Sequence, residues 1–317
     1  MSDPEVATKA PESDAADDTP STSENPDAKP PLCDDCTSDR PTPSGQAATG
    51  EIVKINGIDC YISKPADYPH VPARLLLLLT GGTGVKSTNN QIQADKYAGE
   101  GFLSVMPDLF EGDAAPNSKV TEDENIPLIE KIKMRVADAA KSFVLDMWLA
   151  RHTDEKVLPI LHKVLGGSKE MFTDAANNGI YGVGYCFGGR YILLLSSERE
   201  LPTSWEQKSE DEEGGSKLKG PFLKAGALAH ATCVTPEDFN GLKAPISMVC
   251  VENDGLFPDD VRVAGEDYLS KNNVEHEVQV YPGVPHGFAI VGEYENANIK
   301  EAQVTAYEQM LSWVKDH

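Results

Sequence analysis

The sequence predicts an α/β fold, in which a mostly parallel, doubly wound sheet carries helices on both faces. Short β-rich runs alternate with helical runs through most of the chain after residue 48, which is the element order of a parallel sheet. Residues 75–79 are all Leu, whereas a strand with one solvated face alternates apolar and polar residues. This run therefore indicates a central strand that is covered by helices on both faces.

The individual elements follow from local signals. A β-hairpin opens the domain, because residues 51–55 and 58–63 flank Asn56-Gly57, a dipeptide typical of a type I′ turn. Ligands in parallel sheets bind beyond the carboxyl ends of the strands, so the residues that follow each strand are the candidates for a site. Further strands are expected at 75–79, 102–106, 179–184, 225–229, 246–251 and 275–281. Hydrophobic periodicity predicts helices at 90–100, 131–150, 157–165, 187–197, 258–269 and 302–314.

Residues 1–48 differ in composition from the rest of the chain. They are rich in Pro, Ser, Thr and Asp and hold almost no large apolar side chains. Such a segment buries too little apolar surface to offset its ordering entropy, so we predict a disordered acidic tail. Residues 49–317 then form one domain, with a hydrophilic stretch near 198–220 that we interpret as a flexible acidic insertion.

The chain is strongly acidic, with a formal net charge of −23 at pH 7 and a sequence pI near 4.6. Phosphate backbones and anionic lipids would repel it, so we expect no nucleic-acid partner and no membrane partner. No apolar run approaches the ~18 residues of a membrane span. The first residues show no secretory pattern, and a cytoplasmic location is the resulting expectation. Either a monomer or a homodimer is compatible with the sequence.

The most informative segment lies between a predicted strand and a predicted helix. It reads GYCFGG at residues 184–189, with Gly two positions before and two after Cys186. This pattern is typical of the nucleophile elbow, a sharp turn that projects the central side chain above the sheet. At that place the helix N-terminus favours a thiolate, and the Phe187 amide can bind a developing oxyanion. The alternative is a buried Cys186 packed as a small hydrophobe.

Elbow chemistry also needs an acid and a His later in the chain, in that order. Asp254 lies just past the predicted strand at 246–251, and His286 follows the one at 275–281. In this arrangement Asp254 fixes the tautomer of His286, and His286 deprotonates Cys186 and later protonates the leaving group.

These residues resemble the dienelactone hydrolases, α/β-hydrolases with a Cys, His and Asp triad, and fungal and yeast members most closely. The resemblance extends from about residue 50 to the C-terminus. It implies an α/β-hydrolase fold, hydrolysis of small esters and lactones, no metal and no organic cofactor. By that resemblance Cys186 is the nucleophile, Asp254 the orienting acid and His286 the base. The resemblance to this family rests on six segments: NNQ at 89–91 with AD at 94–95, GF at 101–102, PDLFEGD at 107–113, the elbow at 184–189, LFP at 256–258 and HGF at 286–288.

Two positions depart from that family's pattern. Gly81 stands where members have an acid that contacts the resting thiol, although the amide of Gly82 in the same loop can serve as a second oxyanion donor. Ile290 and Val291 stand where typical members have an Arg that can hold a substrate carboxylate. The sequence therefore favours a neutral or bulkier lactone or ester.

Other signals are weaker. His230 ends a predicted strand and is expected either to line the pocket or to pack against the sheet. Cys33 and Cys36 have the spacing of a redox pair or half a zinc site, but no second pair follows, so we interpret them as ordinary tail residues. The glycine-rich run at residues 80–84 suggests a phosphate-binding loop, but it lacks the Lys-Ser/Thr ending of a P-loop, so we expect no nucleotide binding. The remaining thiols, Cys60, Cys233 and Cys250, are expected in the core.

The sequence thus predicts a cofactor-independent hydrolase of small lactones or esters that acts through a thioester on Cys186. Two alternatives remain open at this point. One is a catalytically impaired small-molecule-binding protein on the same fold, and the other is an acyltransferase that uses the same nucleophile with an amine or thiol in place of water.

Overall fold

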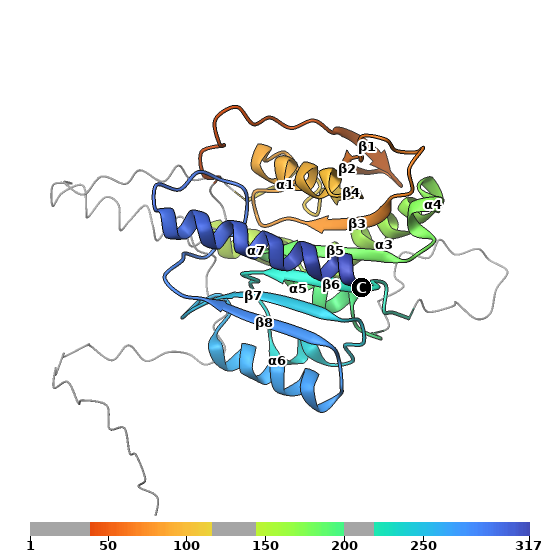
Figure 1. Cartoon of the computed structure of the whole chain (residues 1–317). Coiled ribbons are helices and arrows are strands. Elements are labelled where there is room, and N and C mark those ends of the chain that lie inside the picture. Colours follow the sequence, from red (N-terminus) through yellow and green to blue (C-terminus); the bar gives the residue numbers. More distant parts are fainter. Residues whose placement is uncertain (1–38, 116–143, 200–218) are drawn as a thin grey trace, which may run out of the picture.

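Eight strands form one sheet, in which the all-leucine run occupies a central place. The computed structural model describes residues 39–115, 144–199 and 219–317 (Figure 1). The strand order is β1-β2-β4-β3-β5-β6-β7-β8; β2 is antiparallel to β1 and β4, and all other neighbours are parallel. The strands are β1 (Glu51–Ile55), β2 (Ile58–Ser63), β3 (Arg74–Leu79), β4 (Phe102–Pro107), β5 (Ile180–Tyr185), β6 (Ala225–Ala229), β7 (Ile246–Val251) and β8 (His276–Tyr281).

Helices cover both faces of this sheet, as predicted. One face packs against α1 and α7, and the other packs against α3, α5 and α6 (Figure 1). A mostly parallel sheet can hide its apolar strands only when both faces are covered in this way. The helices are α1 (Thr88–Gly99), α3 (Asp154–Met171), α4 (Thr173–Ala176), α5 (Phe187–Leu195), α6 (Asp259–Lys271) and α7 (Ala297–Asp316), with a short 3-10 helix η2 (Pro236–Phe239).

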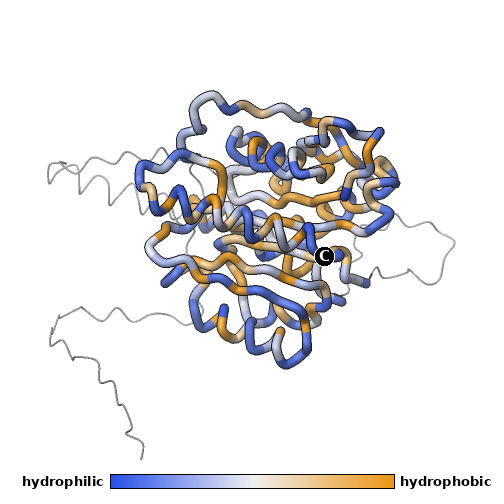
Figure 2. Tube along the Cα trace, in the orientation of Figure 1, coloured by the Kyte–Doolittle hydropathy of each residue, from blue (hydrophilic) through white to orange (hydrophobic). Residues whose placement is uncertain are grey.

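Strand β3 shows how the two cores divide. Leu75, Leu77 and Leu79 point into the core on the α3 and α5 side. Leu76 and Leu78 point into the core beneath α1 and α7. All five are buried, and the central strands form the most hydrophobic part of the trace in Figure 2. Because successive side chains alternate between faces, a strand buried on both sides must be apolar throughout.

The predicted hairpin is confirmed. Strands β1 and β2 pair in register from Glu51 opposite Ile62 to Ile55 opposite Ile58. The two turn residues, Asn56 and Gly57, have φ angles of 45° and 86°. Positive φ at both positions defines the type I′ turn.

The structure differs from the sequence prediction in some boundaries. Helix α3 continues past Gly166-Gly167 to Met171, although glycine usually ends a helix. A Cβ at Gly167 would lie 2.5 Å from the Ile55 side chain, so this glycine allows α3 to approach β1 closely. Helix α7 begins at Ala297, capped by the Asn296 side chain, which is earlier than predicted.

The structure also describes the last ten residues of the predicted tail. Residues 39–48 lie within the described structure, and its first residues hydrogen-bond to the domain. Local composition missed this because the bonds are made to residues more than 40 positions away. Residues 1–38, with Cys33 and Cys36, and most of the predicted helix at 131–150 and of the insertion near 198–220 lie outside the described residues.

Candidate active site

Cys186 occupies a sharp turn between β5 and α5. Its backbone has φ 50° and ψ −118°, a conformation that costs a non-glycine residue about 1–3 kcal/mol. Neighbouring backbone holds it in place: the Cys186 amide donates to Ala229 O at 3.1 Å, and the Thr232 amide donates to Cys186 O at 3.2 Å. The side chain is buried but lines a cavity. This is the strand-turn-helix geometry of a nucleophile elbow.

The flanking glycines make this turn possible. A Cβ at Gly184 would lie 2.7 Å from the carbonyl oxygen of Gly188, and a Cβ at Gly188 would lie 2.4 Å from the carbonyl oxygen of Leu79. The Gly188 amide donates to Thr80 O at 3.0 Å. The first turn of α5 therefore rests directly on the backbone of β5 and the end of β3, where any side chain would push it away.

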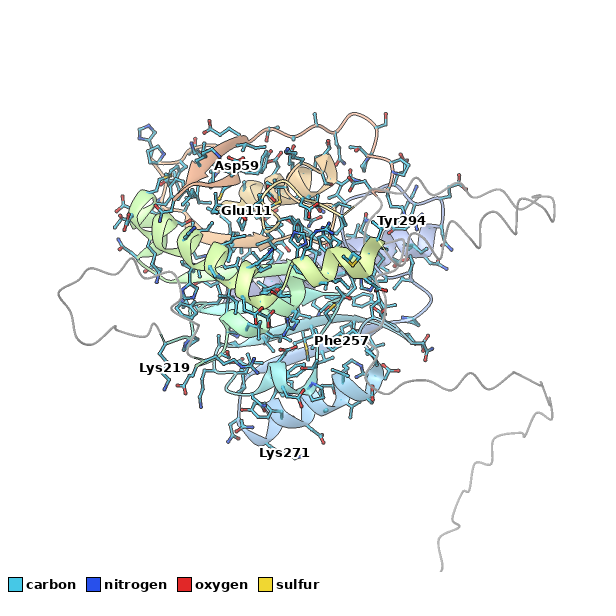
Figure 3. All side chains as sticks on the ribbon, turned by 180° about the vertical axis from the view of Figure 1, so that it is seen from behind. Asp59, Glu111, Lys219, Phe257, Lys271 and Tyr294 are labelled. Atoms are coloured by element: carbon cyan, nitrogen blue, oxygen red, sulfur yellow. The ribbon has the colours of Figure 1, made fainter. Side chains whose placement is uncertain are left out.

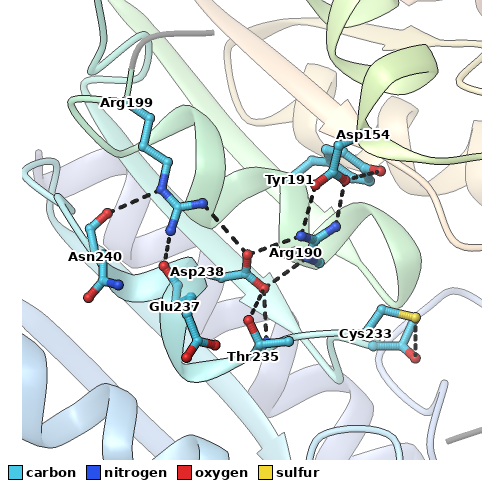
Figure 4. Close-up of polar contacts among 10 residues, drawn as sticks. Asp154, Arg190, Tyr191, Arg199, Cys233, Thr235, Glu237, Asp238 and Asn240 are labelled. Carbon is cyan, nitrogen blue, oxygen red and sulfur yellow. Dashed lines mark hydrogen bonds and ion pairs between the residues drawn. The ribbon is translucent and has the colours of Figure 1, made fainter. Parts of the chain in front are cut away.

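Arg190 fixes α5 from its outer side, as the close-up in Figure 4 shows. Its guanidinium makes two hydrogen bonds to Asp154 at the start of α3, of 2.6 and 3.0 Å, and two to Asp238 in η2, of 2.8 and 3.1 Å. The Tyr191 hydroxyl donates to Asp154 at 3.1 Å. Because Asp238 is almost fully buried, these contacts tie the elbow helix to two neighbouring elements.

Asp254 and His286 meet at the same edge of the sheet. Asp254 follows β7 and His286 follows β8, and Asp254 Oδ2 lies 2.7 Å from His286 Nδ1. Both side chains are buried, with 4% and 6% of their surfaces exposed. Asp254 Oδ1 also accepts a hydrogen bond from the Leu256 amide at 2.9 Å. The carboxylate thus holds the ring with Nδ1 facing it, which leaves Nε2 for chemistry.

The charges of this group support one another. Burial disfavours the imidazolium of His286, but the hydrogen bond to Asp254 and the contact with the Cys186 sulfur outweigh burial and hold its pKa well above the usual 6.5. Burial also disfavours the Asp254 carboxylate, but the His286 contact and the Leu256 amide lower its pKa below 3.8. The ring of His286 is therefore cationic, and it lies between Asp254 and Cys186, which can both carry negative charge.

A hydrogen-bond chain links the elbow to the loop that carries His286. Gln93 on α1 is buried; its amide nitrogen donates to the Tyr185 hydroxyl at 3.0 Å, directly before Cys186. Its carbonyl oxygen accepts from the Val291 amide at 3.1 Å, five residues after His286. Gln93 therefore connects the strand that presents the thiol with the loop that presents the imidazole.

Cys186 and His286 line the same cavity, whose volume is about 40 Å³. Of the other residues that the sequence singled out, Gly81, His230, Ile290 and Val291 line it as well. Gly82 and Asp254 do not, although Asp254 contacts His286. Phe187 lines instead a second cavity of about 280 Å³. Its amide is at the first position of α5, where N–H groups have no partner within the helix. The 40 Å³ cavity is lined by Asp39, Arg40, Gly81, Thr83, Asn89, Asn90, Cys186, His230, His286, Gly287, Ile290, Val291 and Tyr294.

Comparison with known proteins identifies the family of this chain. The model of the dienelactone hydrolase family matches residues 58–204 and 216–317. The chain belongs to the dienelactone hydrolase family. It is accordingly a hydrolase that acts on esters, and a small ester or lactone is its class of substrate.

Fungal relatives agree with this assignment, and solved structures share the fold. Hydrolase pyvD of Aspergillus violaceofuscus is 27% identical over 84% of this chain and 90% of its own length. Dienlactone hydrolase 1 of Gibberella moniliformis is 28% identical over 76% of this chain and 77% of its own. Among solved structures, a dienelactone hydrolase candidate from Klebsiella pneumoniae has a TM-score of 0.60 at 20% identity, covering 86% of this chain and all of its own. An esterase from Thermogutta terrifontis has a TM-score of 0.54 at 13% identity, covering 85% and 96%. These structures show the α/β-hydrolase fold.

In this dienelactone hydrolase family member, His230 is packed beside His286. Their ring centroids are 4.9 Å apart, and His230 has a φ of 36° at the end of β6. Burial and the charge of His286 hold the pKa of His230 well below 6.5, so the ring is neutral at pH 7. Neither ring nitrogen has a hydrogen-bond partner among the described residues. His230 therefore presents an unsatisfied polar ring to the cavity.

Sequence reasoning missed part of the cavity wall. Asp39 and Arg40 were assigned to the tail, and Tyr294, labelled in Figure 3, lies in the loop before α7 and was not singled out. Asn89 and Asn90 were quoted only as part of a resemblance. Their run of two amides at a helix start was the available signal, but no local pattern marks Asp39 or Arg40.

The remaining thiols and possible metal ligands lie elsewhere. Cys60 and Cys250 are buried, and burial raises the pKa of each to about 12, so both stay protonated. Cys233 is half-buried, less so than predicted, because it lies in an irregular loop after β6 with a φ of 59°. Within the described ranges, no three His, Cys, Asp or Glu side chains gather as metal ligands would, and no helix has the length and apolarity to cross a bilayer.

Proposed function

We propose that this chain hydrolyses small lactones or esters through a Cys186-His286-Asp254 triad and a thioester acyl-enzyme. The observation that carries the proposal is the 2.7 Å contact between Asp254 and His286, with His286 and Cys186 in one cavity. An oriented imidazole beside a thiol on a strained elbow is the arrangement that activates a cysteine nucleophile.

The Cys186 thiol first gives its proton to His286, which forms the cationic ring and a thiolate. The thiolate then attacks the carbonyl carbon of the ester. The amides of Phe187 and Gly82 donate to the oxyanion that forms. The carbonyl then reforms, the alkoxide leaves with a proton from His286, and the acyl group remains as a thioester on Cys186. In the second step His286 deprotonates water, which attacks the thioester and releases the acid and the thiol.

The raised pKa of His286 supports a route to the thiolate that does not need an acid at Gly81. A more basic imidazole accepts the thiol proton more readily, and the contacts with Asp254 and Cys186 outweigh the burial that disfavours the charged ring. The Asp254 carboxylate stabilises the cationic ring. The proton transfer therefore needs no further carboxylate in the loop after β3.

Replacing the nucleophile tests this function. Cys186→Ala should lower kcat/KM for 4-nitrophenyl butyrate by at least about 10³-fold while the circular-dichroism spectrum and melting temperature are retained, because the attacking atom is lost and little packing changes. Cys250→Ala is the matched control and should keep most of the activity. Full turnover by Cys186→Ala would contradict the proposal.

A further inference from the structure

His230 is a buried polar side chain whose ring nitrogens bond to no described residue. The residue directly follows β6, is only 1% exposed, and lines the same cavity as Cys186 and His286. Its backbone is fixed, because its amide donates to Val249 O at 2.8 Å. Buried polar groups nearly always have a hydrogen-bond partner, which is an ordered water where no protein atom is in reach. The ring of His230 therefore needs a partner that enters the cavity.

The rings packed around His230 hold it without offering it a hydrogen bond. The centroids of the Tyr185, His286 and Phe288 rings lie 6.0, 4.9 and 6.1 Å from its own. Phe288 has no polar side-chain atom, and the Tyr185 hydroxyl accepts a hydrogen bond from Gln93 at 3.0 Å. These contacts fix the orientation of the imidazole and leave its nitrogens for a partner in the cavity.

The cavity that His230 and His286 share has the size of a small water cluster. Its volume is about 40 Å³, and a water molecule needs about 10–15 Å³ of such space and about two to four polar partners. Two imidazole nitrogens that bond the same water lie at most about 5.6 Å apart, which is twice an ordinary hydrogen-bond length. Ring centres 4.9 Å apart are compatible with such a shared water.

The protonation states suit a water that is to be deprotonated. Nδ1 of His286 faces Asp254 at 2.7 Å, so Nε2 is the nitrogen that acts as the base. After the first step of the proposed reaction, His286 has passed its proton to the leaving group and is neutral. His230 is neutral as well, because burial and the charge of His286 hold its pKa well below 6.5. A neutral imidazole has one nitrogen that accepts, so His230 can accept a hydrogen bond from water.

We propose that His230 binds and orients the water that hydrolyses the thioester on Cys186. The proposal rests on the proposed function and assigns a residue to its second step. One proton of this water points to His286 Nε2, and the other is hydrogen-bonded to a nitrogen of His230, which leaves a lone pair of the oxygen for the thioester carbon. His286 takes the first proton as the C–O bond forms. The C–S bond then breaks, the sulfur recovers that proton from His286, and His230 neither gains nor loses a proton.

The two steps of the reaction separate this role from a structural one. His286 acts in both steps, so a residue that merely supports His286 affects both, whereas a residue that holds the water affects the second alone. With 4-nitrophenyl trimethylacetate, the initial burst of nitrophenol measures acylation and the linear phase measures deacylation. His230→Ala should keep the burst rate constant within about threefold and slow the linear phase by about tenfold or more, since a hydrogen bond to the reacting water is lost.

A second readout is the choice between water and another nucleophile. With hydroxylamine at a fixed concentration, the acyl-enzyme yields the hydroxamate in competition with the acid. The ratio of hydroxamate to acid should rise by about tenfold in His230→Ala, because hydroxylamine does not depend on the water bound at His230. His230→Asn tolerates the positive φ and keeps an acceptor oxygen, so it should recover part of the wild-type ratio.

Cys233→Ala is the matched control. Cys233 lies three residues further along the same loop, also at a positive φ, but it does not line the cavity of Cys186. Both phases should stay within about twofold of the wild type in this variant. Equal slowing of the burst and the linear phase in His230→Ala, or an unchanged linear phase, would overturn the role of His230 while the proposed function stands.

If the wild type forms no acyl adduct on Cys186, the proposed function fails, and a crystal structure then decides separately whether His230 binds water. A water in the cavity within about 3.2 Å of a His230 nitrogen supports the water site. Ring nitrogens that bond to no water, or that bond only to protein atoms, overturn it.

Discussion

The His230 imidazole is a buried polar group that the protein itself does not satisfy. Both ring nitrogens lack a partner among the described residues, and the backbone is held at a positive φ. An unsatisfied buried polar group costs about 1–3 kcal/mol, so the fold tolerates this ring at a price in stability. Its place beside His286 and in the wall of the cavity gives it access to a polar atom of a substrate or to water.

This residue predicts a pH dependence of stability. Since the folded pKa of His230 lies well below 6.5, the unfolded chain takes up a proton near pH 6.5 that the folded chain does not. Stability from this group is therefore present above pH 6.5 and is lost as the pH falls below it. Between pH 7.5 and 5.5, the free energy of unfolding of the wild type should fall by about 1.4 kcal/mol more than that of His230→Asn, measured in urea.

Asn is the matched replacement because it tolerates a positive φ and does not titrate. The other histidines are present in both proteins, so the contributions of those that do not interact with His230 cancel in the difference; His286 is the one whose charge acts on His230. Identical pH dependence in the two proteins would show that His230 has an ordinary pKa.

Among single residues, the sequence pointed to Cys186, Asp254 and His286 because each follows a strand with a distinctive pattern, and parallel strands bring their carboxyl ends to one edge. The structure brings these three together. Arg40 could not be found in the same way, because its position depends on hydrogen bonds to Asn89 across 49 residues.

At the scale of elements, the turn at Cys186 depends on the contacts that hold helix α5 in place. Glycines let its first turn touch β3, and Arg190 ties its outer face to Asp154 and Asp238 (Figure 4). Asp238 is only 2% exposed and also accepts a hydrogen bond from the Thr235 amide at 2.9 Å. The strained turn at Cys186 is therefore held by contacts on both sides of the helix that follows it.

Asp238→Ala should lower the free energy of unfolding by about 2–3 kcal/mol in urea titrations, because it removes two charge-assisted hydrogen bonds from the half-buried Arg190 guanidinium. The control is Asp259→Ala, which removes an exposed partner of Arg262 and should cost less than about 1 kcal/mol. Similar losses in the two variants would contradict a special role for the Arg190 contacts.

Most elements were predicted within a few residues, because strands and helices here follow hydrophobic periodicity and turn residues closely. Helix α3 is the instructive exception. Its glycines suggested an end at residue 165, but Gly167 serves the close approach to Ile55 rather than a stop. Whether a glycine ends a helix or allows packing depends on a partner that the local sequence does not contain.

At the scale of the whole molecule, the net charge of −23 describes the chain and not its site. The cavity combines a thiol, imidazoles, one arginine and one aspartate from segments at residues 39–40, 81–90, 186, 230 and 286–294. Overall charge and composition lead us to expect no nucleic-acid partner, but they carry no information on which charges the fold assembles around the sulfur.

The central claim is that the acyl group passes through Cys186. The most direct measurement is acid quenching of the enzyme during turnover of 4-nitrophenyl trimethylacetate, whose hindered thioester hydrolyses slowly, followed by peptide mass spectrometry. We predict a mass increase of one trimethylacetyl group on the peptide that contains Cys186, absent in Cys186→Ala. Release of nitrophenol with the acyl group on another residue, or with no adduct and full activity in Cys186→Ala, would contradict the account.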